Sequence, residues 1–410
     1  SRSPKASQDM LEIKHKFKTK GTGPVSFHLG CDFFRDEDGV PCMAPRRCVE
    51  RMVDTCVEMF GAKPKQTASS PLEKGDHPEL DTTDELDEEG ASKHQSLIGA
   101  MQWAMALGRL DIAVAVMTMS SFRSAPPIGH MDRVRRMHGH LSKMRHGTIG
   151  FRTGEPDCSD LEEDRCDWLH SACGEVHEEP PTDMPRPLGK PVVHTQHFDA
   201  NLCHDLIAGR SVTAVLDFLN QTPMDWHSKK QATVETATHG SEFAAGRTGV
   251  QRTVDIRTTL RHLGAPVKGK TRMFGDNQAV VTSATVPHSV LKKRHHALAC
   301  HEVREAVASD VISLHHLPGP ENPADILSKH WGCQQAWELL QPILFWQGDT
   351  LKCGRRGLKG SEENSPLSTT QGASPPVAGS EQVCGAALEG SADPVVGTEG
   401  VHATGVVPDG

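Results

Sequence analysis

One stretch decides the fold of the second half of the chain: Met224-Asp225-Trp226-His227-Ser228-Lys229-Lys230-Gln231-Ala232-Thr233-Val234, followed by Ser241-Glu242-Phe243. Met224 to His227 is predicted to be a strand. A threonine-rich segment then opens a long helix, predicted over residues 233–263, which ends at Gly264. A strand that leads directly into a long helix is typical of an α/β domain.

The pattern continues on both sides of this stretch. The predicted strands are 192–200, 211–219, 224–227, 271–276 and 311–317, and the predicted helices are 233–263, 277–285, 290–308 and 323–345. The first two strands meet at a turn around Gly209-Arg210. Strands that alternate with helices in this order predict an α/β domain over residues 192–345.

The first half of the chain predicts an α+β arrangement. Residues 25–34 predict a strand, and residues 35–39 its hairpin turn. Apolar residues at helical spacing predict a helix from Arg47 to Phe60. The apolar run 94–122 is predicted to be helical up to Pro126-Pro127, and a basic helix is predicted over residues 130–146.

The net charge of −9 is unevenly distributed. Residues 73–89 hold nine acids and one base, residues 155–183 hold eleven acids and one base, and residues 191–350 hold fifteen of each. We therefore predict acidic linkers at 73–93 and 155–191, beside a charge-balanced domain for which nucleic acid stays open as a partner. Residues 351–410 are rich in Gly, Ser, Pro, Val and Ala and contain no aromatic residue, so that a disordered tail is predicted over 346–410.

The twelve cysteines contain no C-x-x-C pair, and no apolar run of about 18 residues or signal-peptide pattern is present. We expect reduced cysteines, no membrane partner and an intracellular location, in the cytoplasm, a virus-like particle or the nucleus.

Four short segments each place a carboxylate at the end of a predicted strand or the start of a helix. They are Phe198-Asp199-Ala200-Asn201, Gly240-Ser241-Glu242-Phe243, Phe274-Gly275-Asp276-Asn277 and Asn322-Pro323-Ala324-Asp325. Cleavage of a phosphodiester with two divalent ions needs several carboxylates that converge on one point. Spacing alone is weak evidence, because a chain with 53 acids contains many such quartets and surface acids are usually just solvated.

The residues that flank the carboxylates make the pattern specific. The opening stretch, with Ser241-Glu242-Phe243, closely resembles the W-x-S-K-K-Q…S-x-E-(Y/F) signature of copia-type retrotransposon ribonuclease H domains. The other matching segments, in the family's order, are Gly275-Asp276-Asn277, Lys292-Lys293-Arg294-His295, His301-Glu302-Val303-Arg304-Glu305 and Pro323-Ala324-Asp325-Ile326-Leu327-Ser328-Lys329. The resemblance implies a ribonuclease H-like mixed five-stranded sheet with flanking helices.

The resemblance extends upstream. The segments Phe27-His28-Leu29-Gly30, His94-Gln95-Ser96-Leu97 and Asp111-Ile112-Ala113-Val114-Ala115 look like those that follow the catalytic palm in copia-type reverse transcriptases. They imply a fragment of a Pol polyprotein, with a palm-end remnant at 1–72 and thumb- or connection-like helices at 94–154. In the family the polymerase aspartates lie before these segments. Because the chain contains no Asp-Asp pair, we expect no polymerase activity from it.

The resemblance also implies roles for the site residues. Asp199, Glu242 and Asp276 would ligate Mg²⁺, for which Mn²⁺ could substitute, and Asp325 would complete the shell of a second ion. The implied reaction is endonucleolytic hydrolysis of the RNA strand of an RNA–DNA hybrid. His316 lies nine residues before Asp325, where related ribonucleases often have a mobile histidine. It could equally be one of 24 ordinary histidines.

The same segments also suggest residues that contact a nucleic-acid partner. The candidates for phosphate contacts are Lys229, Lys230, Lys292, Lys293 and Arg294. The alternative for these side chains is a charged surface that keeps the chain in solution. The rest of a Pol polyprotein is a further candidate partner, and no small-molecule cofactor is expected.

The chain contains no tyrosine. His94, His227 and His239 stand where the family pattern commonly has tyrosine, which suggests either a biased loss of tyrosine or drift in an element free of selection. The leading hypothesis is a hybrid-specific endoribonuclease. The alternatives are an inactive retroelement remnant or nucleic-acid-binding module, and another nuclease or integrase of the same superfold, against which the opening stretch argues.

Overall fold

The computed structural model describes residues 24–347 apart from 67, 162–165, 172, 175–176, 179–181 and 291–295, together with residues 8, 11–13 and 15–16. The described residues belong to one compact unit, Ser1–Lys359. All but the first two residues of the predicted tail 346–410 lie outside them. Within the described part of the chain, no helix is both long enough and apolar enough to span a membrane.

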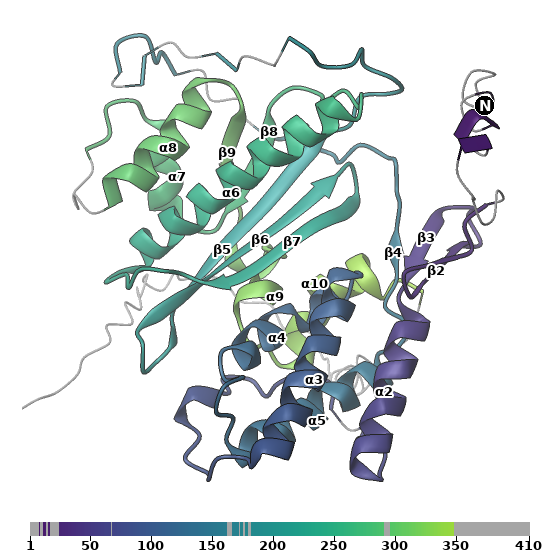
Figure 1. Ribbon diagram of the computed structural model, residues 1–410. Helices are drawn as coiled ribbons and strands as arrows, with labels where there is room; N and C mark the ends of the chain where they lie inside the picture. Colours follow the sequence, from purple (N-terminus) through teal and green to yellow (C-terminus); the bar gives the residue numbers. More distant parts are fainter. Residues whose placement is uncertain are drawn as a thin grey trace, which may run out of the picture. The chain divides into compact units, whose positions relative to one another are not determined.

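A mixed five-stranded sheet forms the second half of this unit (Figure 1). Its strands are β5 (His194–Asp205), β6 (Arg210–Leu219), β7 (Thr222–Lys230), β8 (Thr271–Gly275) and β9 (Ile312–His316). They lie in the order β7-β6-β5-β8-β9; the first three are antiparallel, while β8 and β9 run parallel to β5. This order confirms the predicted ribonuclease H-like sheet.

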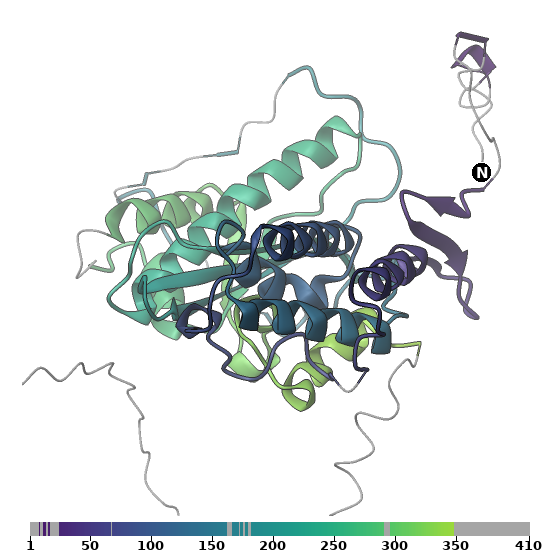
Figure 2. The same cartoon turned by 60° about the horizontal axis from the view of Figure 1, so that its bottom comes forward.

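Helices cover both faces of the sheet (Figures 1 and 2). One face carries α6 (Thr238–His262), α7 (Gln278–Thr285) and α8 (Ala297–Ala308), which share an apolar core with the sheet. The other face carries α9 (Asp325–Ser328) and α10 (Cys333–Leu344), together with the first half of the chain. Because both faces are covered, the central strands β5 and β6 are buried along most of their length.

Small residues allow α6 to lie close to the sheet. A Cβ atom added at Gly249 would lie 2.4 Å from the Gln196 Oε1 atom of β5, so that a larger residue there would force the Gln196 side chain to shift. The predicted helix 233–263 is confirmed as α6, but it begins at Thr238, because residues 233–237 turn the chain between β7 and α6.

The first half of the chain forms a small antiparallel sheet and a group of helices. The strands are β1 (Phe27–His28), β2 (Cys31–Arg35), β3 (Pro41–Ala44) and β4 (Ile149–Gly150), and the main helices are α2 (Arg46–Phe60), α3 (Glu88–Ala106), α4 (Ala113–Ser120) and α5 (Ile128–Lys143). The α+β prediction and the helix from Arg47 to Phe60 are confirmed.

Three predicted elements are interrupted. The single strand 25–34 is wrong, because Leu29 and Gly30 adopt positive φ angles of 52° and 94° and turn the chain between β1 and β2. The helical run 94–122 breaks at Gly108, with φ 112°. The helical segment 323–345 is likewise two helices, α9 and α10, since Lys329 is extended.

The acidic stretch 73–93, which we expected to be a linker, packs against the basic helix α5. Arg133 pairs with Asp76 at 2.9 Å and with Asp81, and Arg136 pairs with Glu73 at 3.1 Å. Although burial raises it, hydrogen bonds from Thr83 and Arg133 lower the pKa of Asp81 to about 2. The clustered acids thus pair with two of the bases of α5. The domain boundaries drawn from composition stay a prediction.

The two halves of the unit share a third apolar cluster, which contains Leu110, Leu216 and Leu327. At the same junction, the Trp226 indole donates a hydrogen bond of 3.1 Å to the Met105 carbonyl. Trp226 of the opening stretch is therefore a packing residue.

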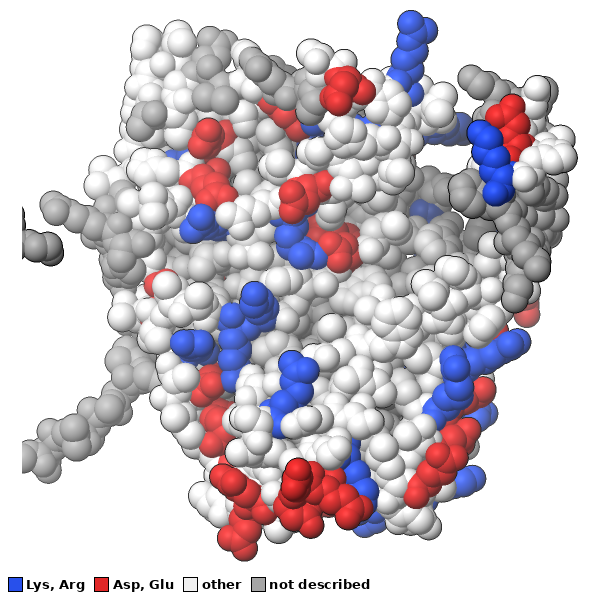
Figure 3. Space-filling view, in the orientation of Figure 1, with Lys and Arg blue, Asp and Glu red and all other residues white. Residues whose placement is uncertain are grey.

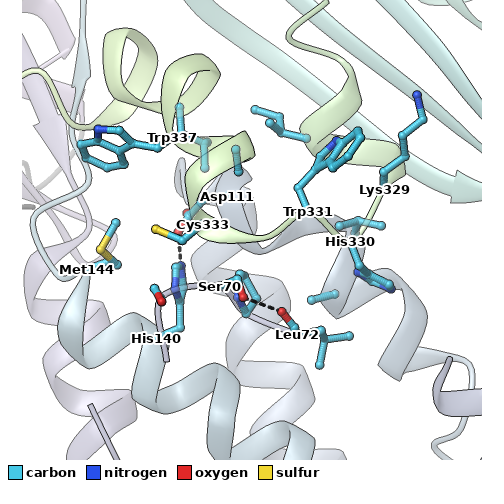
Figure 4. Close-up of a pocket in the computed structure, with 17 residues that line it drawn as sticks. Ser70, Leu72, Asp111, His140, Met144, Lys329, His330, Trp331, Cys333 and Trp337 are labelled. Atoms are coloured by element: carbon cyan, nitrogen blue, oxygen red, sulfur yellow. Dashed lines mark hydrogen bonds and ion pairs between the residues drawn. The ribbon is translucent and has the colours of Figure 1, made fainter. Parts of the chain in front are cut away.

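A buried ion network adjoins this cluster. Arg109 pairs with Asp111 at 2.7 Å, and the His140 ring lies 3.0 Å from the same carboxylate. Although burial raises the pKa of Asp111, Arg109 and His140 lower it below its usual range. The network borders a cavity of about 40 Å³ between α5 and α10 (Figure 4).

Candidate active site

Three of the four predicted carboxylates converge. Asp199 lies in β5, Asp276 follows the last residue of β8, and Asp325 is the first residue of α9. Each offers one oxygen atom, and these three atoms lie within 4.8 Å of one another. Residues that are 126 positions apart in the sequence thus meet at one point, as the resemblance implied.

The approach of Asp276 to Asp199 depends on Gly275. The ring of Phe198 lies against the Gly275 backbone, and a Cβ atom there would lie 2.4 Å from the Phe198 Cζ atom. Parallel pairing of β5 with β8, in register at His197 and Phe274, brings the two strand ends together. Glycine at 275 therefore allows the two aspartates to share one site.

The segment that carries Asp325 is fixed to β5 by hydrogen bonds. The Asn322 side-chain amide donates to the Phe198 carbonyl at 2.9 Å, and the Asn201 amide donates to the Ser328 carbonyl at 3.2 Å. The Ser328 hydroxyl donates to the Asp199 carboxylate. These bonds hold α9 with its first residue, Asp325, facing Asp199.

Glu242, in α6, is not one of the three carboxylates that meet within 4.8 Å, but it is close enough to Asp199 and Asp276 for their charges to raise its pKa. The side-chain amide of Gln231, the residue directly after β7, donates to the Ser241 carbonyl at 2.9 Å and fixes the start of this helix. Glu242 is 4% exposed, and its carboxylate accepts a hydrogen bond from the Ala200 backbone. Its Oε2 atom is buried and has no hydrogen-bond partner among the described residues. A buried acceptor without a partner is costly unless a ligand satisfies it.

The carboxylates repel one another. Burial, Asp199 and Asp276 raise the pKa of Glu242 well above its usual range. Burial and Asp199 also raise the pKa of Asp276. The same two causes raise the pKa of Asp325 to about 7, outweighing the nearby Lys329 ammonium. Hard oxygen donors, mutual repulsion and an unsatisfied Glu242 oxygen together fit a divalent cation such as Mg²⁺.

Lys329 lies among these carboxylates. Its Nζ atom is 2.7 Å from Asp325 Oδ1 and 3.2 Å from Asp199 Oδ1. Lys329 belongs to one of the motifs in the sequence, but no role was predicted for it; its position four residues after Asp325, one helical turn away, was the available signal. Ser328, Asn322 and Gln231 were missed in the same way, since their hydrogen bonds form only in the folded chain.

The remaining candidates lie in different places. The His316 ring donates a hydrogen bond of 3.1 Å from Nε2 to the Asp276 carbonyl, so this exposed histidine borders the carboxylates. Lys229 and Lys230 point to opposite faces of β7, because side chains alternate along a strand. Lys230 pairs with Asp205 at 2.7 Å and lies over the Phe122 ring, whereas Lys229 is exposed.

Lys292, Lys293 and Arg294 lie outside the described residues. On the face in Figure 3, acidic side chains gather at the lower edge, over the N-terminal helices, while charges of both signs are interspersed above them. The surface view thus agrees with a charge-balanced second half, and the phosphate contacts stay a prediction.

Two of the histidines at expected tyrosine positions are poorly solvated. His94 is fully buried, and neither ring nitrogen has a hydrogen-bond partner among the described residues. Burial and the neighbouring His130 lower the pKa of His94 to about 4, and burial and Arg252 lower that of His227 to about 4. Both imidazoles are therefore neutral at neutral pH.

Comparisons with known proteins agree with the sequence resemblance. No family model matches the chain. It is 22% identical over 324 residues, 78% of its length, to the retrovirus-related Pol polyprotein from transposon TNT 1-94 of Nicotiana tabacum. It is 20% identical over 317 residues, 77% of its length, to the Pol polyprotein from transposon RE1 of Arabidopsis thaliana. The chain spans about a fifth of these relatives, 21% and 19% respectively.

Among solved structures, the chain is similar to the ribonuclease H1 of Halobacterium salinarum NRC-1, with a TM-score of 0.26, 15% identity, and coverage of 36% of this chain and 98% of that one. It is also similar to LC11-RNase H1, solved in complex with an RNA/DNA hybrid, with a TM-score of 0.27, 15% identity, and coverage of 33% and 93%. From the Pol relatives and the strand order of its sheet, the chain is a distant homologue of copia-type retrotransposon Pol polyproteins that carries a ribonuclease H-like domain.

Proposed function

We propose that the chain is a metal-dependent endoribonuclease that hydrolyses the RNA strand of an RNA–DNA hybrid. The observation that carries the proposal is the convergence of Asp199, Asp276 and Asp325 within 4.8 Å, beside the buried Glu242, in a sheet of ribonuclease H order. Buried carboxylates that repel one another favour a bound cation, because the cation offsets both their burial and their repulsion.

The chain's own residues would divide the work as follows. Asp199, Glu242, Asp276 and Asp325 would hold Mg²⁺, or Mn²⁺ in its place. When bound, a divalent ion would lower the pKa of the attacking water and stabilise charge on the leaving 3′ oxygen. Asp199 is oriented for this by the Ser328 hydroxyl.

Around the carboxylates, two side chains would act on the substrate. His316, at the edge of the site, would hold a proton near the leaving oxygen. The exposed Lys229 would contact a phosphate without reading sequence. Discrimination of RNA from DNA would rest on contacts to the ribose 2′-hydroxyl.

The test is cleavage of a labelled RNA strand annealed to DNA, with single-stranded RNA and DNA duplex as controls. We expect cleavage of the hybrid in Mg²⁺ and none in EDTA. Asp276→Asn should reduce the rate by at least about 100-fold, as losses at metal sites commonly do. Asp255→Asn is the matched control, because Asp255 is exposed on α6.

The same experiment separates the alternative. Failure of the folded wild-type chain to cleave any hybrid would contradict the proposal and leave an inactive remnant or a binding module. A gel-shift assay with the uncut hybrid would then distinguish these two, since only the module retains the duplex.

A further inference from the structure

A cavity of about 280 Å³ lies between β4, the strands β5 to β7 and the end of α10. The lining side chains that could recognise a ligand are those of Arg152, His197, Phe218 and Trp346. The volume is close to the lower end of the range of about 300–1,000 Å³ that is usual for ligand pockets. The cavity therefore fits a small molecule or a single residue of a larger one.

Arg152 brings an uncompensated positive charge to this cavity. The side chain is half-buried, and its guanidinium carbon lies 5.0 Å from the centre of the Trp346 ring. It has no ion pair with an acid in the described part of the chain, since Glu155, the nearest acid in the sequence, pairs with Lys268 at 2.7 Å. No aspartate or glutamate is among the described residues that line the cavity. An arginine held in this way has N–H donors to offer a phosphate, so that the cavity attracts an anion.

His197 brings polar atoms that the described chain does not satisfy. Its ring is stacked on Phe274 at 4.9 Å between centroids and meets the Phe218 ring edge-on at 5.6 Å. The Nδ1 atom is buried and has no hydrogen-bond partner among the described residues. Burial lowers the pKa of His197 to about 4, so that at neutral pH one ring nitrogen donates and the other accepts. Polar atoms of this kind favour a ligand that forms hydrogen bonds with them.

A nucleotide combines the groups that these side chains recognise. Its phosphate carries negative charge, its base has a flat face that packs on aromatic rings, and the edge of the base carries hydrogen-bonding atoms. We propose that this cavity binds one unpaired nucleotide, with the phosphate at Arg152 and the base against His197 and Phe218. The nucleotide is either free in solution or an unpaired residue of a nucleic-acid strand, because the same chemistry recognises both.

Calorimetric titration with adenosine 5′-monophosphate (AMP) tests the proposal. The titration is carried out in EDTA, so that no metal ion holds the phosphate at the carboxylates. Adenosine and inorganic phosphate are the comparison ligands, because each lacks one half of AMP. We expect one AMP per chain, and at least about fivefold weaker binding of either half, since the phosphate contact and base stacking each contribute about this factor. An affinity for AMP no higher than that for inorganic phosphate would overturn the proposal.

Two variants test the residues. Arg152→Gln removes the charge, and His197→Phe removes the ring nitrogens but keeps an aromatic ring. Each should weaken AMP binding at least about fivefold. The matched control is Arg135→Gln, because Arg135 is also half-buried and lies over an aromatic ring, that of Phe60 at 4.8 Å, but does not line the cavity. Wild-type affinity for AMP in either folded variant would overturn the proposal, and should one variant fail to fold, the other still decides.

The carboxylate site supplies a further control. Asp276→Asn should bind AMP as the wild type does, because Asp276 does not line this cavity. Loss of AMP binding in this variant would place AMP at the carboxylates and overturn the proposal. Because AMP binding does not depend on cleavage, failure of the proposed function is a separate result.

Competition distinguishes the two sources of the nucleotide. The competitors, again in EDTA, are a blunt RNA–DNA hybrid and the same hybrid with a single-stranded DNA extension. Displacement of AMP by the extended hybrid alone identifies an unpaired strand residue as the ligand, and displacement by neither identifies a free nucleotide. Equal displacement by both would overturn the assignment to an unpaired nucleotide.

Discussion

Replacing Asp325 by asparagine should stabilise the metal-free protein at alkaline pH. Asp325 is 5% exposed, and burial and Asp199 raise its pKa from 3.8 to about 7. The shift of about 3 pKa units, at 1.36 kcal/mol each, corresponds to about 4 kcal/mol of destabilisation once Asp325 is ionised. This shift already includes the favourable Lys329 contact. The buried asparagine amide must find new hydrogen-bond acceptors, which offsets about 1–2 kcal/mol of the gain, so that about 2–3 kcal/mol remains.

The stability gained by Asp325→Asn depends on pH within a defined window. Because the folded pKa of Asp325 lies above the unfolded value, its protonation stabilises the fold at low pH, and this stabilisation is lost as the pH rises from about 4 to 7. The advantage of Asp325→Asn should therefore be close to zero at pH 5 and complete at pH 8.

Urea unfolding in EDTA, followed by circular dichroism at pH 5 and pH 8, measures this difference. At pH 8 the gain of about 2–3 kcal/mol corresponds to a rise in Tm on the order of 5–10 °C. Asp255→Asn serves as the control, with no change expected at either pH. Equal stability of Asp325→Asn and wild type at pH 8, or the same gain at both pH values, would refute the reasoning.

Three further predictions concern packing and buried polar groups. His94→Phe should raise the free energy of unfolding by about 1–2 kcal/mol at pH 7.5, because it removes a buried imidazole that has no hydrogen-bond partner among the described residues. The gain should be larger at pH 5, because the wild type loses stability as the pH falls from 6.5 towards the folded pKa of about 4. A fall in the thermal unfolding midpoint of the variant would contradict this. Gly275→Ala should lower the free energy of unfolding by about 1–3 kcal/mol, because its Cβ would overlap the Phe198 ring, and it should also slow hybrid cleavage. An unchanged unfolding midpoint together with an unchanged cleavage rate would show that Phe198 does not lie against residue 275. Asp111→Asn should cost about 3–5 kcal/mol in thermal unfolding, since Arg109 is left buried and uncompensated, and a loss below about 1 kcal/mol would show that the pair is not buried in solution.

Much of the second half could be predicted because its signals are local. The alternation of strand and helix and the turn at Gly209 are visible in consecutive residues, and the mixed five-stranded sheet of ribonuclease H type was implied by the resemblance of the opening stretch. The four carboxylates were also predicted in this way, through the residues that flank each of them.

What could not be predicted depends on contacts between distant segments. Apolar content alone does not show that Leu29 and Gly30 turn the chain, because the positive φ angles become necessary only when β1 pairs with β2. Composition suggested a linker at 73–93, whereas Arg133 and its partners show that clustered acids can pack on a basic helix. The place of Lys329 required the fold, since it depends on how α9 lies against β5.

Cleavage of an RNA–DNA hybrid by the purified chain, with the chemical ends of the products mapped, tests the central claim most directly. Hydrolysis at the carboxylates of Asp199, Glu242, Asp276 and Asp325 predicts products with 3′-hydroxyl and 5′-phosphate ends, formed in Mg²⁺ and not in EDTA. Cleavage that persists in EDTA, products that carry 2′,3′-cyclic phosphates, or no cleavage by the folded chain would contradict it.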